Sequence, residues 1–341
     1  MIERYSLKEK SILITGGTGS FGKQVARALL KDELCEKVVI FSRDEWKQSE
    51  MQKMDPIFCS EKIRYFLGDV RDLQRLGRAF YDIDIVIHAA ALKQVPAAEY
   101  NPSEFVKTNV QGASNVIDMA IERGVERVIA LSTDKSVNPV NLYGATKLCS
   151  DKLFIAGNAY VGRREKPLFS IVRYGNVLGS RGSVIPRWID LLKQGNLSIP
   201  ITDPNMTRFW ITLDYAVAFV LASLKRMLGA EIFVPKIPSL SIADLAKAVA
   251  PEASLQTIGA REGEKLHEIL INNDEAAYTV DCGSYYVILP PVHKKKLEMR
   301  IQPYLHTGQL VSSDFIYTSQ SNPDWLSIEE VRHLLSQLLE H

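Results

Sequence analysis

The sequence predicts an α/β fold built on a doubly wound parallel sheet, with a smaller region at its C-terminal end. Short runs rich in β-branched residues alternate with longer amphipathic stretches through the first half, a rhythm typical of parallel sheets. Runs such as Ile85-Val86-Ile87 are apolar without interruption, as in strands buried on both faces. A glycine-rich turn directly follows the first of these runs. Together these features predict a Rossmann-type sheet.

The expected elements follow in chain order. Strands are expected over residues 11–15, 37–42, 63–67, 85–89, 127–132 and 169–174, and helices over 22–31, 72–81, 104–123 and 141–157. Glycine and proline interrupt the rhythm after Asn176. A helix over 213–228 and a strand over 231–235 are expected to return to the main sheet.

Composition excludes several classes of protein. The 341 residues carry 41 basic and 40 acidic side chains, a net charge of +1, which argues against nucleic-acid binding and polybasic membrane attachment. No apolar run reaches the ~18 residues of a membrane-spanning helix. The six histidines form no ligand cluster and the four cysteines no C-x-x-C pair, so we expect no metal site. A reduced, cytoplasmic enzyme is the class that fits best.

The glycine-rich turn predicts a dinucleotide site. Glycines in the pattern G-x-x-G-x-x-G allow a tight turn and a close approach to a pyrophosphate, which then lies at the positive end of a helix. The pattern alone is a weak signal, and its position between a strand and a helix strengthens it. The residues expected to contact the cofactor here are Gly16, Thr18, Gly19, Ser20, Phe21 and Gly22.

The end of the second strand indicates which dinucleotide binds. NAD sites carry an acidic residue about 20 residues past the glycines, where it binds the ribose 2′-hydroxyl. Here the chain has Ser42-Arg43-Asp44, with Lys47 nearby. Ser42 and Arg43 could hold a 2′-phosphate, which favours NADP, whereas Asp44 keeps NAD possible.

Residues at the ends of the next two strands complete the predicted cofactor site. Asp69-Val70 is expected at the adenine edge, although a simple turn would also explain it. Small residues at Ala89-Ala90 would let a cofactor lie against the backbone. Lys93 could reach the ribose or a substrate, although a surface lysine is the plainer interpretation.

Tyr143 and Lys147 stand four residues apart, so a helix would place them on one face. A lysine ammonium beside a phenol favours the phenolate, which would make Tyr143 a base near neutral pH. The pattern Y-x-x-x-K is common and mostly structural. Its position after a strand that ends in Leu131-Ser132-Thr133 favours a catalytic pair.

Thr133-Asp134-Lys135 makes the sequence recognisable. Together with the glycine turn, Tyr143 and Lys147, it resembles the extended short-chain dehydrogenase/reductase superfamily, which modifies nucleotide sugars. Within that superfamily the Asp-Lys pair resembles the inverting UDP-N-acetylglucosamine 4,6-dehydratases, which begin pseudaminic acid biosynthesis in bacteria. The resemblance runs almost from end to end of the chain.

The resemblance implies a reaction and residue roles. NADP⁺ would take hydride from C4 of the sugar while Tyr143 accepts the hydroxyl proton. Lys135 would then remove the C5 proton, Asp134 would assist loss of the C6 hydroxyl, and hydride would return to C6. We expect burial near Lys147 to lower the pKa of Lys135, and Asp134 needs a raised pKa. Without the motif, a salt bridge between Asp134 and Lys135 would be the simpler interpretation.

The same resemblance implies a substrate site. It assigns Val177 to the nicotinamide and Asn176, Arg261 and Glu264 to the substrate, and Thr133 and Lys93 are expected beside the sugar. Arg181 and Arg208 are candidates for the diphosphate of UDP, because arginine is its natural partner, although a surface position would explain each arginine alone.

These assignments define the expected domains and alternatives. Residues 1–177, with 211–236, are expected to form the NADP-binding domain, and 178–210 and 237–341 the substrate-binding region. A UDP-hexose 4-epimerase is the main enzymatic alternative, and it would not need the Asp-Lys pair. A non-catalytic NADP-sensing protein is the second alternative. We also expect a homo-oligomer, paired through the helices over 104–123 and 141–157.

Overall fold

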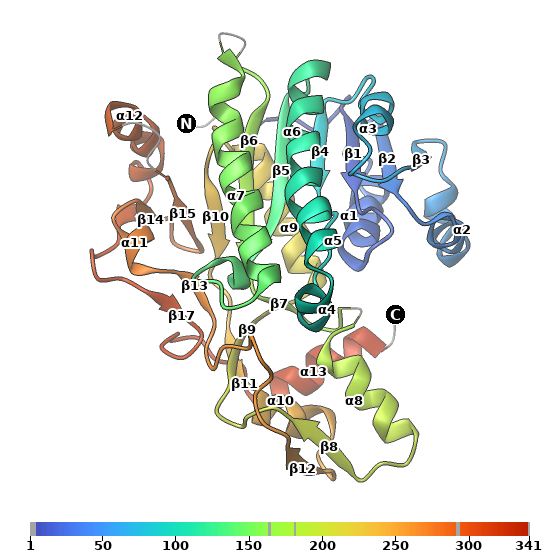
Figure 1. Cartoon of the computed structure of the whole chain (residues 1–341), viewed down its shortest axis with the longest axis vertical. Helices are drawn as coiled ribbons and strands as arrows, with labels where there is room; N and C mark the ends of the chain where they lie inside the picture. Colours follow the sequence, from blue (N-terminus) through green and yellow to red (C-terminus); the bar gives the residue numbers. More distant parts are fainter. Residues whose placement is uncertain (1–4, 163–164, 181, 291–293, 340–341) are drawn as a thin grey trace.

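The computed structural model describes residues 5–162, 165–180, 182–290 and 294–339. Its main feature is a ten-stranded sheet, in which seven parallel strands lie side by side (Figure 1). In spatial order these are β3 (Ile63–Leu67), β2 (Lys37–Ser42), β1 (Ser11–Thr15), β4 (Ile85–His88), β5 (Arg127–Thr133), β6 (Leu168–Tyr174) and β10 (Ile232–Pro235). The expected α/β fold is confirmed.

The strand order reverses between β1 and β4. From β1 the chain winds outward through β2 to β3, and it then returns to pair β4 in parallel with the other side of β1. Loops that leave the carboxyl ends of β1 and β4 therefore diverge in opposite directions. Such a reversal opens a crevice above the sheet, where ligands of doubly wound folds bind.

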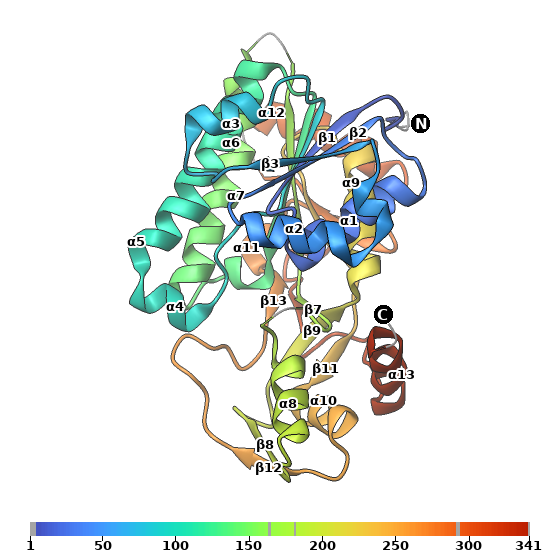
Figure 2. The ribbon, with the colours of Figure 1, turned by 90° about the vertical axis from the view of Figure 1, so that its right-hand side faces the viewer.

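Helices cover both faces of the sheet (Figure 2). One face carries α1, α2 and α9, and the other carries α3, α6 and α7. Their bounds are α1 (Ser20–Lys31), α2 (Glu45–Met54), α9 (Leu213–Arg226), α3 (Leu73–Ala79), α6 (Gly112–Arg123) and α7 (Leu142–Tyr160). The core between these layers consists of the β-branched residues that predicted the strands, such as Ile12, Ile14 and Ile87, each with no exposed surface.

The helix expected over 104–123 is interrupted. It consists of α5 (Pro102–Phe105), a π-helical segment η2 (Val106–Gln111) and α6. Within η2, the Asn109 amide donates to the carbonyl of Leu92 and to the Thr146 hydroxyl at 2.9 and 3.0 Å. The wider turn thus brings a polar side chain to the loop after β4 and to α7. Further short helices are η1 (Pro56–Cys59), α4 (Val95–Tyr100) and η3 (Asp134–Ser136).

The sheet continues past β10 in a way that the sequence did not predict. The strand β15 (Tyr285–Ile288) pairs antiparallel with β10, and β14 (Thr279–Asp281) and β16 (Gln309–Leu310) follow. We expected all of 237–341 in the substrate region, whereas this segment extends the main sheet. Antiparallel strands joined by a short turn need no crossover helix, so the strand–helix rhythm does not reveal them. Close to these strands lie α11 (Asn273–Ala276) and α12 (Lys294–Leu305).

A smaller unit, here called the cap, lies below the carboxyl ends of the parallel strands in Figure 1. Its own apolar core includes Trp188, Leu240 and Val331, which are at most 1% exposed. The cap contains α8 (Val184–Lys193), α10 (Ile242–Val249), α13 (Ile328–Leu339), the pair β8 (Ser198–Ile201) and β12 (Ser254–Thr257), and the strands β7 (Asn176–Val177), β9 (Thr207–Ile211) and β11 (Ser239–Ser241). The pair β13 (Ile269–Ile271) and β17 (Tyr317–Thr318) joins it to the main sheet.

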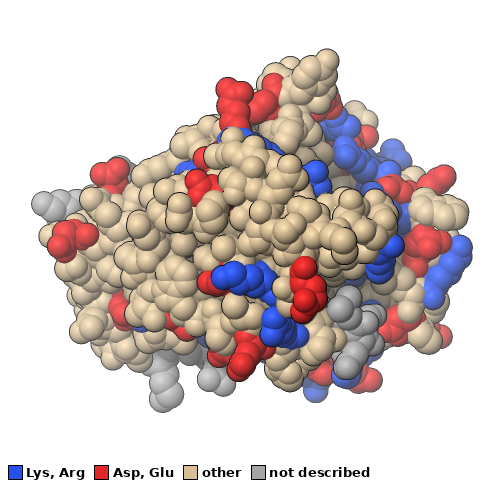
Figure 3. All heavy atoms as spheres, turned by 90° about the horizontal axis from the view of Figure 1, so that it is seen from below, with Lys and Arg blue, Asp and Glu red and all other residues tan. Residues whose placement is uncertain are grey.

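The surface at the cap end mixes both signs of charge, and Lys and Arg lie among Asp and Glu in the view of Figure 3. Within the described residues, no helix combines the length and the apolar character needed to cross a membrane.

His88 ends β4 in the middle of the sheet, and its Nδ1 atom lies 2.8 Å from the Thr15 hydroxyl of β1. Burial, with the charge of Lys147, lowers the pKa of His88 from 6.5 to about 3. The folded chain keeps this ring neutral at pH values where the unfolded chain binds a proton. Stability is therefore lost as the pH falls below about 6.5.

We predict that His88→Asn removes part of this acid sensitivity. Between about pH 7 and pH 5, the wild-type chain is expected to lose about 2 kcal/mol more free energy of unfolding than the variant. Urea unfolding of both proteins at the two pH values measures this difference. Equal losses would show that His88 is not responsible.

Candidate active site

A cleft of about 930 Å³ is lined both by residues at the carboxyl ends of the parallel strands and by residues of the cap. Of the site residues that the sequence predicted, all that the structure describes line this cleft, except Asp134. Arg181 lies outside the described residues. Residues from β2, β4, β5, α7, the turn after β1 and the cap thus meet in one place.

The glycine-rich turn passes close to the neighbouring strand end. Gly16 has a φ of +67°, and a Cβ atom on it would lie 2.9 Å from the Ala90 Cα atom. The helix α1 then begins after Gly19 with no side chain capping its amide groups and no acidic residue in its first turn. Free N–H groups at a helix N-terminus attract an anion. This turn therefore fits the pyrophosphate of a dinucleotide.

Side-chain contacts at the end of β2 separate the roles of three predicted residues. The carboxylate of Asp44 caps α2 by accepting from the Lys47 amide at 3.0 Å, and it pairs with Lys47 Nζ at 2.8 Å. These contacts lower the pKa of Asp44. Arg43 is half exposed, and its guanidinium lies 3.9 Å from Asp69. Arg43 thus has one long ionic contact, to Asp69, whereas Asp44 is held by two contacts with Lys47.

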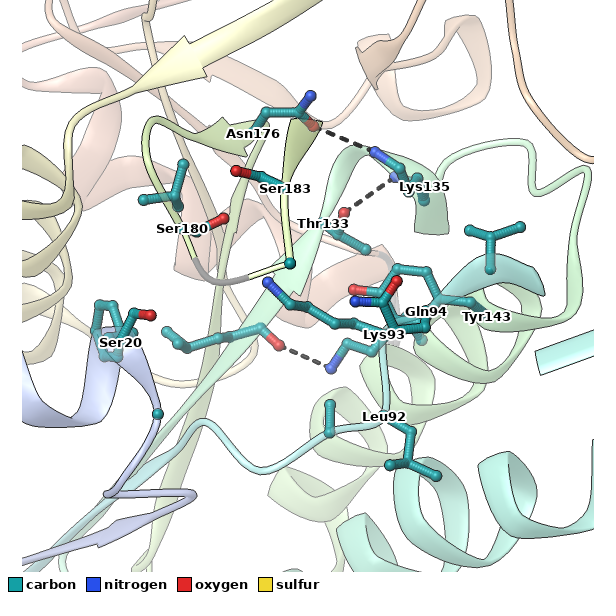
Figure 4. A pocket seen from close by; sticks show the side chains of 18 of the residues that line it. Ser20, Leu92, Lys93, Gln94, Thr133, Lys135, Tyr143, Asn176, Ser180 and Ser183 are labelled. Carbon is teal, nitrogen blue, oxygen red and sulfur yellow. Dashed lines mark hydrogen bonds between the residues drawn. The ribbon is translucent and has the colours of Figure 1, made fainter. Parts of the chain in front are cut away.

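The other cofactor candidates are held by backbone contacts. The amides of Ala89 and Ala90 both donate to the Thr15 hydroxyl, at 3.2 and 3.3 Å. The carbonyl of Val70 accepts from Asn115 of α6 at 2.9 Å. Lys93 points into the cleft in Figure 4, where burial and then the charge of Lys135 lower its pKa.

Tyr143 and Lys147 lie in the first turns of α7, as expected. Asn141 begins this helix by accepting from the Gly144 amide at 2.8 Å. The ammonium of Lys147 donates to the Leu131 carbonyl at 2.7 Å. Burial raises the pKa of Tyr143 to about 12, and Lys135 offsets this only in part. The expected lowering of the Tyr143 pKa by Lys147 is therefore wrong for the chain alone, because burial outweighs the neighbouring charges.

Thr133, Asp134 and Lys135 form a tight turn at the end of β5. The Thr133 hydroxyl donates to Asp134 Oδ1 at 2.8 Å, and Lys135 Nζ lies 3.1 Å from the same oxygen. Asp134 has no exposed surface, so its carboxylate lies behind Thr133 and Lys135 and not in the cleft. The salt bridge that the sequence left open is present.

Lys135 has two further partners. Its ammonium donates to Asn176 Oδ1 at 3.3 Å (Figure 4), and Glu268 Oε1 lies 3.3 Å away. Burial alone would lower the pKa of Lys135, but the carboxylates of Asp134 and Glu268 outweigh burial and raise it. The expectation of a lowered pKa is therefore wrong for the chain alone.

The cap contributes the remaining predicted residues. Arg261 and Glu264 are linked by an ion pair at 4.0 Å and by a hydrogen bond from the Arg261 amide to the Glu264 carboxylate at 3.3 Å. Arg208 is buried, donates to the carbonyls of Thr207 and Leu266, and lies 3.7 Å from Glu268. Its guanidinium therefore already has several partners within the protein, unlike that of Arg261.

The cleft is positively charged although the chain is nearly neutral. Among the residues that the structure describes, ten Lys and Arg line it, against four Asp and Glu. An excess of positive charge in a partly desolvated cleft attracts anionic ligands. Both a dinucleotide and a nucleotide sugar fit this requirement.

Several residues that shape the site were missed by the sequence reasoning. Glu268 is 2% exposed, and no motif marked it, although it directly follows the recognised segment 261–267. Asp151 stands four residues after Lys147, accepts from the Ser132 hydroxyl at 2.6 Å and lies 4.0 Å from the buried Arg173. An acid spaced i+4 from a catalytic lysine was the signal that could have identified it.

Comparison with known proteins agrees with this geometry. The family model described as polysaccharide biosynthesis protein matches residues 12–290. A UDP-N-acetylglucosamine 4,6-dehydratase (inverting) of Campylobacter jejuni is 53% identical over 329 residues, which cover 96% of this chain and 97% of that protein. A UDP-glucose 4-epimerase of Rickettsia bellii is 41% identical over 337 residues, 97% of this chain and 96% of that protein. The X-ray structure of Pen from Bacillus thuringiensis has a TM-score of 0.88 and 35% identity, and the match covers 98% of this chain and 99% of that one.

The fold and the cleft define an enzyme of the extended short-chain dehydrogenase/reductase superfamily. Within it, the chain belongs to the polysaccharide biosynthesis protein family. The resemblance to the inverting 4,6-dehydratases, first indicated by Thr133-Asp134-Lys135, is confirmed by the relatives of that name.

Gly144 keeps α7 close to the turn that carries Lys135. A Cβ atom on Gly144 would collide with the Lys135 carbonyl oxygen. We predict that Gly144→Ala separates Tyr143 from Thr133 and Lys135 and lowers kcat about 100-fold, because catalysis depends on their alignment. Gly77→Ala, in α3, is the control, since a Cβ there meets the ends of two flexible side chains, the Met119 sulfur at 3.1 Å and the Arg123 guanidinium at 3.5 Å. Steady-state kinetics measures kcat, and circular dichroism checks that both variants are folded. Wild-type kcat in both variants would contradict the prediction.

Proposed function

We propose that the protein is an NADP-dependent inverting UDP-N-acetylglucosamine 4,6-dehydratase that acts in the first step towards pseudaminic acid. The observation that carries the proposal is the meeting of Lys135, Thr133 and Tyr143 beside a dinucleotide-type turn. Bound nicotinamide supplies the hydride acceptor for C4 and later the donor for C6. The chain itself supplies the groups that move protons.

Tyr143 is the base for the first step. Its phenol lies in the cleft and would accept the proton of the C4 hydroxyl as the ketone forms. In the chain alone, burial holds the pKa of Tyr143 at about 12. A cationic nicotinamide ring in the cleft would favour the phenolate, as nearby positive charge does for any acid.

Lys135 and Asp134 serve the elimination, which an epimerase has no need to perform. The 4-ketone acidifies the C5 proton, and Lys135 is the base that faces the cleft. Asp134 lies behind Thr133, whose hydroxyl lines the cleft and donates to Asp134. Asp134 can act as the acid once the proton of the paired Lys135 ammonium has passed to it, which also leaves Lys135 neutral for the C5 proton. Asp134 would then donate to the Thr133 hydroxyl while Thr133 gives its own proton to the leaving C6 hydroxyl. Reprotonation of C5 on the opposite face would invert it.

The substrate would lie between the parallel strands and the cap. Arg261 and Glu264 border the cleft on the cap side and are assigned to UDP, and Asn176 stands beside Lys135 near the sugar. Arg208 would act from behind them, through Glu268, since its guanidinium faces that carboxylate. A homo-oligomer formed through the α5–α6 and α7 surface, in the cytoplasm, completes the proposal.

The reaction can be tested with UDP-N-acetylglucosamine in deuterated water without added cofactor. We predict loss of one water, a 4-keto-6-deoxy product and deuterium at C5, all measured by mass spectrometry and NMR. A product of unchanged sugar mass with inverted C4 would make the protein a 4-epimerase. Bound NADP without turnover of any UDP-sugar would make it a non-catalytic sensor.

The role of Lys135 can be tested with two substitutions. Lys135→Arg keeps a cation for Asp134 and Glu268 but cannot become neutral, and Lys135→Ala removes the base. Both are expected to slow elimination by about 10²–10⁴-fold while NADP stays bound. Lys193→Ala, on the exposed side of α8, is the matched control. Normal turnover by Lys135→Arg would refute the assignment.

The preference for NADP depends on Arg43. Asp44 and Lys47 are paired with each other, whereas the half-exposed Arg43 has only a long contact, at 3.9 Å to Asp69, that a 2′-phosphate could replace. We predict that Arg43→Ala weakens NADP binding about 10-fold or more and leaves NAD binding nearly unchanged, because only NADP carries that phosphate. Fluorescence titration with both cofactors measures the ratio. An equal loss of affinity for NADP and NAD would indicate that Arg43 does not bind the 2′-phosphate.

A further inference from the structure

Glu268 is a buried acid that takes no part in the proton transfers described above. It belongs to the segment that leads from the cap to β13, and its backbone is fixed on both sides. The Glu268 amide donates to the Ser319 hydroxyl at 2.9 Å, and its carbonyl accepts from the Ser319 amide at 2.9 Å. Its side chain is 3% exposed. A carboxylate in such a place needs compensating charge, because burial of an unpaired ion costs several kcal/mol.

Three cations surround this carboxylate, and the nearest is the proposed base. Lys135 Nζ lies 3.3 Å from Glu268 Oε1, Arg208 Nε lies 3.7 Å from the same oxygen, and Lys265 Nζ lies 3.9 Å from Oε2. Among the described residues, Oε2 accepts no hydrogen bond. Glu268 of the cap therefore forms an ion pair with a lysine at the end of a main-sheet strand.

We propose that Glu268 is a positioning residue for Lys135, whose carboxylate holds the ammonium of that lysine in the cleft and retains its proton until substrate is bound. This inference rests on the proposed function, since it concerns the base of that reaction. Glu268 would not touch the substrate. It would act through Lys135, and it would make the state of the base depend on the position of the cap.

The surroundings of Lys135 define the expected effect of each charge. The ionisable groups that act on it are Asp134 from its own turn, Glu268, Arg208 and Lys265 from the cap, Tyr143 from α7 and Lys93 from the loop after β4. Removal of the negative charge of Glu268 should release the Lys135 proton more easily. Removal of the positive charge of Lys265 should do the opposite, since a like charge disfavours the ammonium.

The state of Lys135 can be measured without turnover by trace acetylation with acetic anhydride at about pH 9, because only the neutral amine reacts. Mass spectrometry of the peptides compares Lys135 with the exposed Lys193 in the same sample. We expect Glu268→Gln to raise the relative labelling of Lys135 about tenfold or more, since one unit of pKa is tenfold in neutral amine. Glu268→Asp, which keeps the charge, should stay close to wild type.

Two further variants complete the experiment. Glu252→Gln removes an exposed charge from a turn of the same cap and should leave the labelling of Lys135 unchanged. Lys265→Met should lower it at least threefold, which gives an opposite sign and a second test if Glu268→Gln does not fold. Wild-type labelling in Glu268→Gln, or labelling that does not fall in Lys265→Met, would overturn the proposal.

The dehydratase assay in the same samples separates this inference from the proposed function. If wild type forms no 4-keto product, the proposed function fails, while labelling still decides whether Glu268 controls Lys135. If wild type forms the product, the rising limb of its pH–rate profile should move to lower pH in Glu268→Gln. A merely structural role would lower the rate and leave that limb in place.

Discussion

The parallel pairing of β5 with β6 is the constraint on which the active site depends. The register aligns seven residue pairs and ends with Thr133 opposite Tyr174. Each strand then turns at the same edge of the sheet, so the turn with Asp134 and Lys135 lies beside Asn176. A slip of one residue would move alternate side chains to the other face. The register of two largely buried strands therefore sets the contact between Lys135 and Asn176, which both lie just beyond the paired residues.

The second constraint is electrostatic, and it joins the two parts of the molecule. Asp134 and Glu268 are almost completely buried, one in the main sheet and one at the base of the cap. Lys135 lies between them and pairs with both, and Arg208 and Lys265 of the cap add further positive charge beside Glu268. Without such cations, each buried carboxylate would carry a large desolvation cost. The same charges that hold the cap against the sheet therefore hold the resting base as an ammonium. The ion pairs require the charged form of Lys135, whereas proton removal from C5 requires its neutral form.

The fold was predictable where short-range patterns determine it. Continuous apolar strands, strand–helix alternation and the glycine turn before α1 identified the parallel sheet and its cofactor end. The antiparallel strands β14–β16 were not predictable in this way, because strands joined by short turns break the strand–helix alternation and leave no other pattern of regular spacing. The cleft residues were largely predictable because they follow strand ends or belong to recognised motifs. Glu268 was not, since its partners Lys135 and Arg208 are distant in sequence and only the packing of the cap brings them together.

The pKa directions of Lys135 and Tyr143 indicate the protonation state of the site before ligands bind. Sequence reasoning required a neutral lysine and an ionised tyrosine, whereas the chain alone favours an ammonium at Lys135 and a phenol at Tyr143. Both groups thus hold their protons before ligands arrive. Bound cationic nicotinamide would favour the phenolate of Tyr143, and a longer distance between Glu268 and Lys135 would weaken the hold of Lys135 on its proton. A dehydratase that oxidises C4 before it removes the C5 proton benefits from this order, because a base released early would find no acidic proton to take.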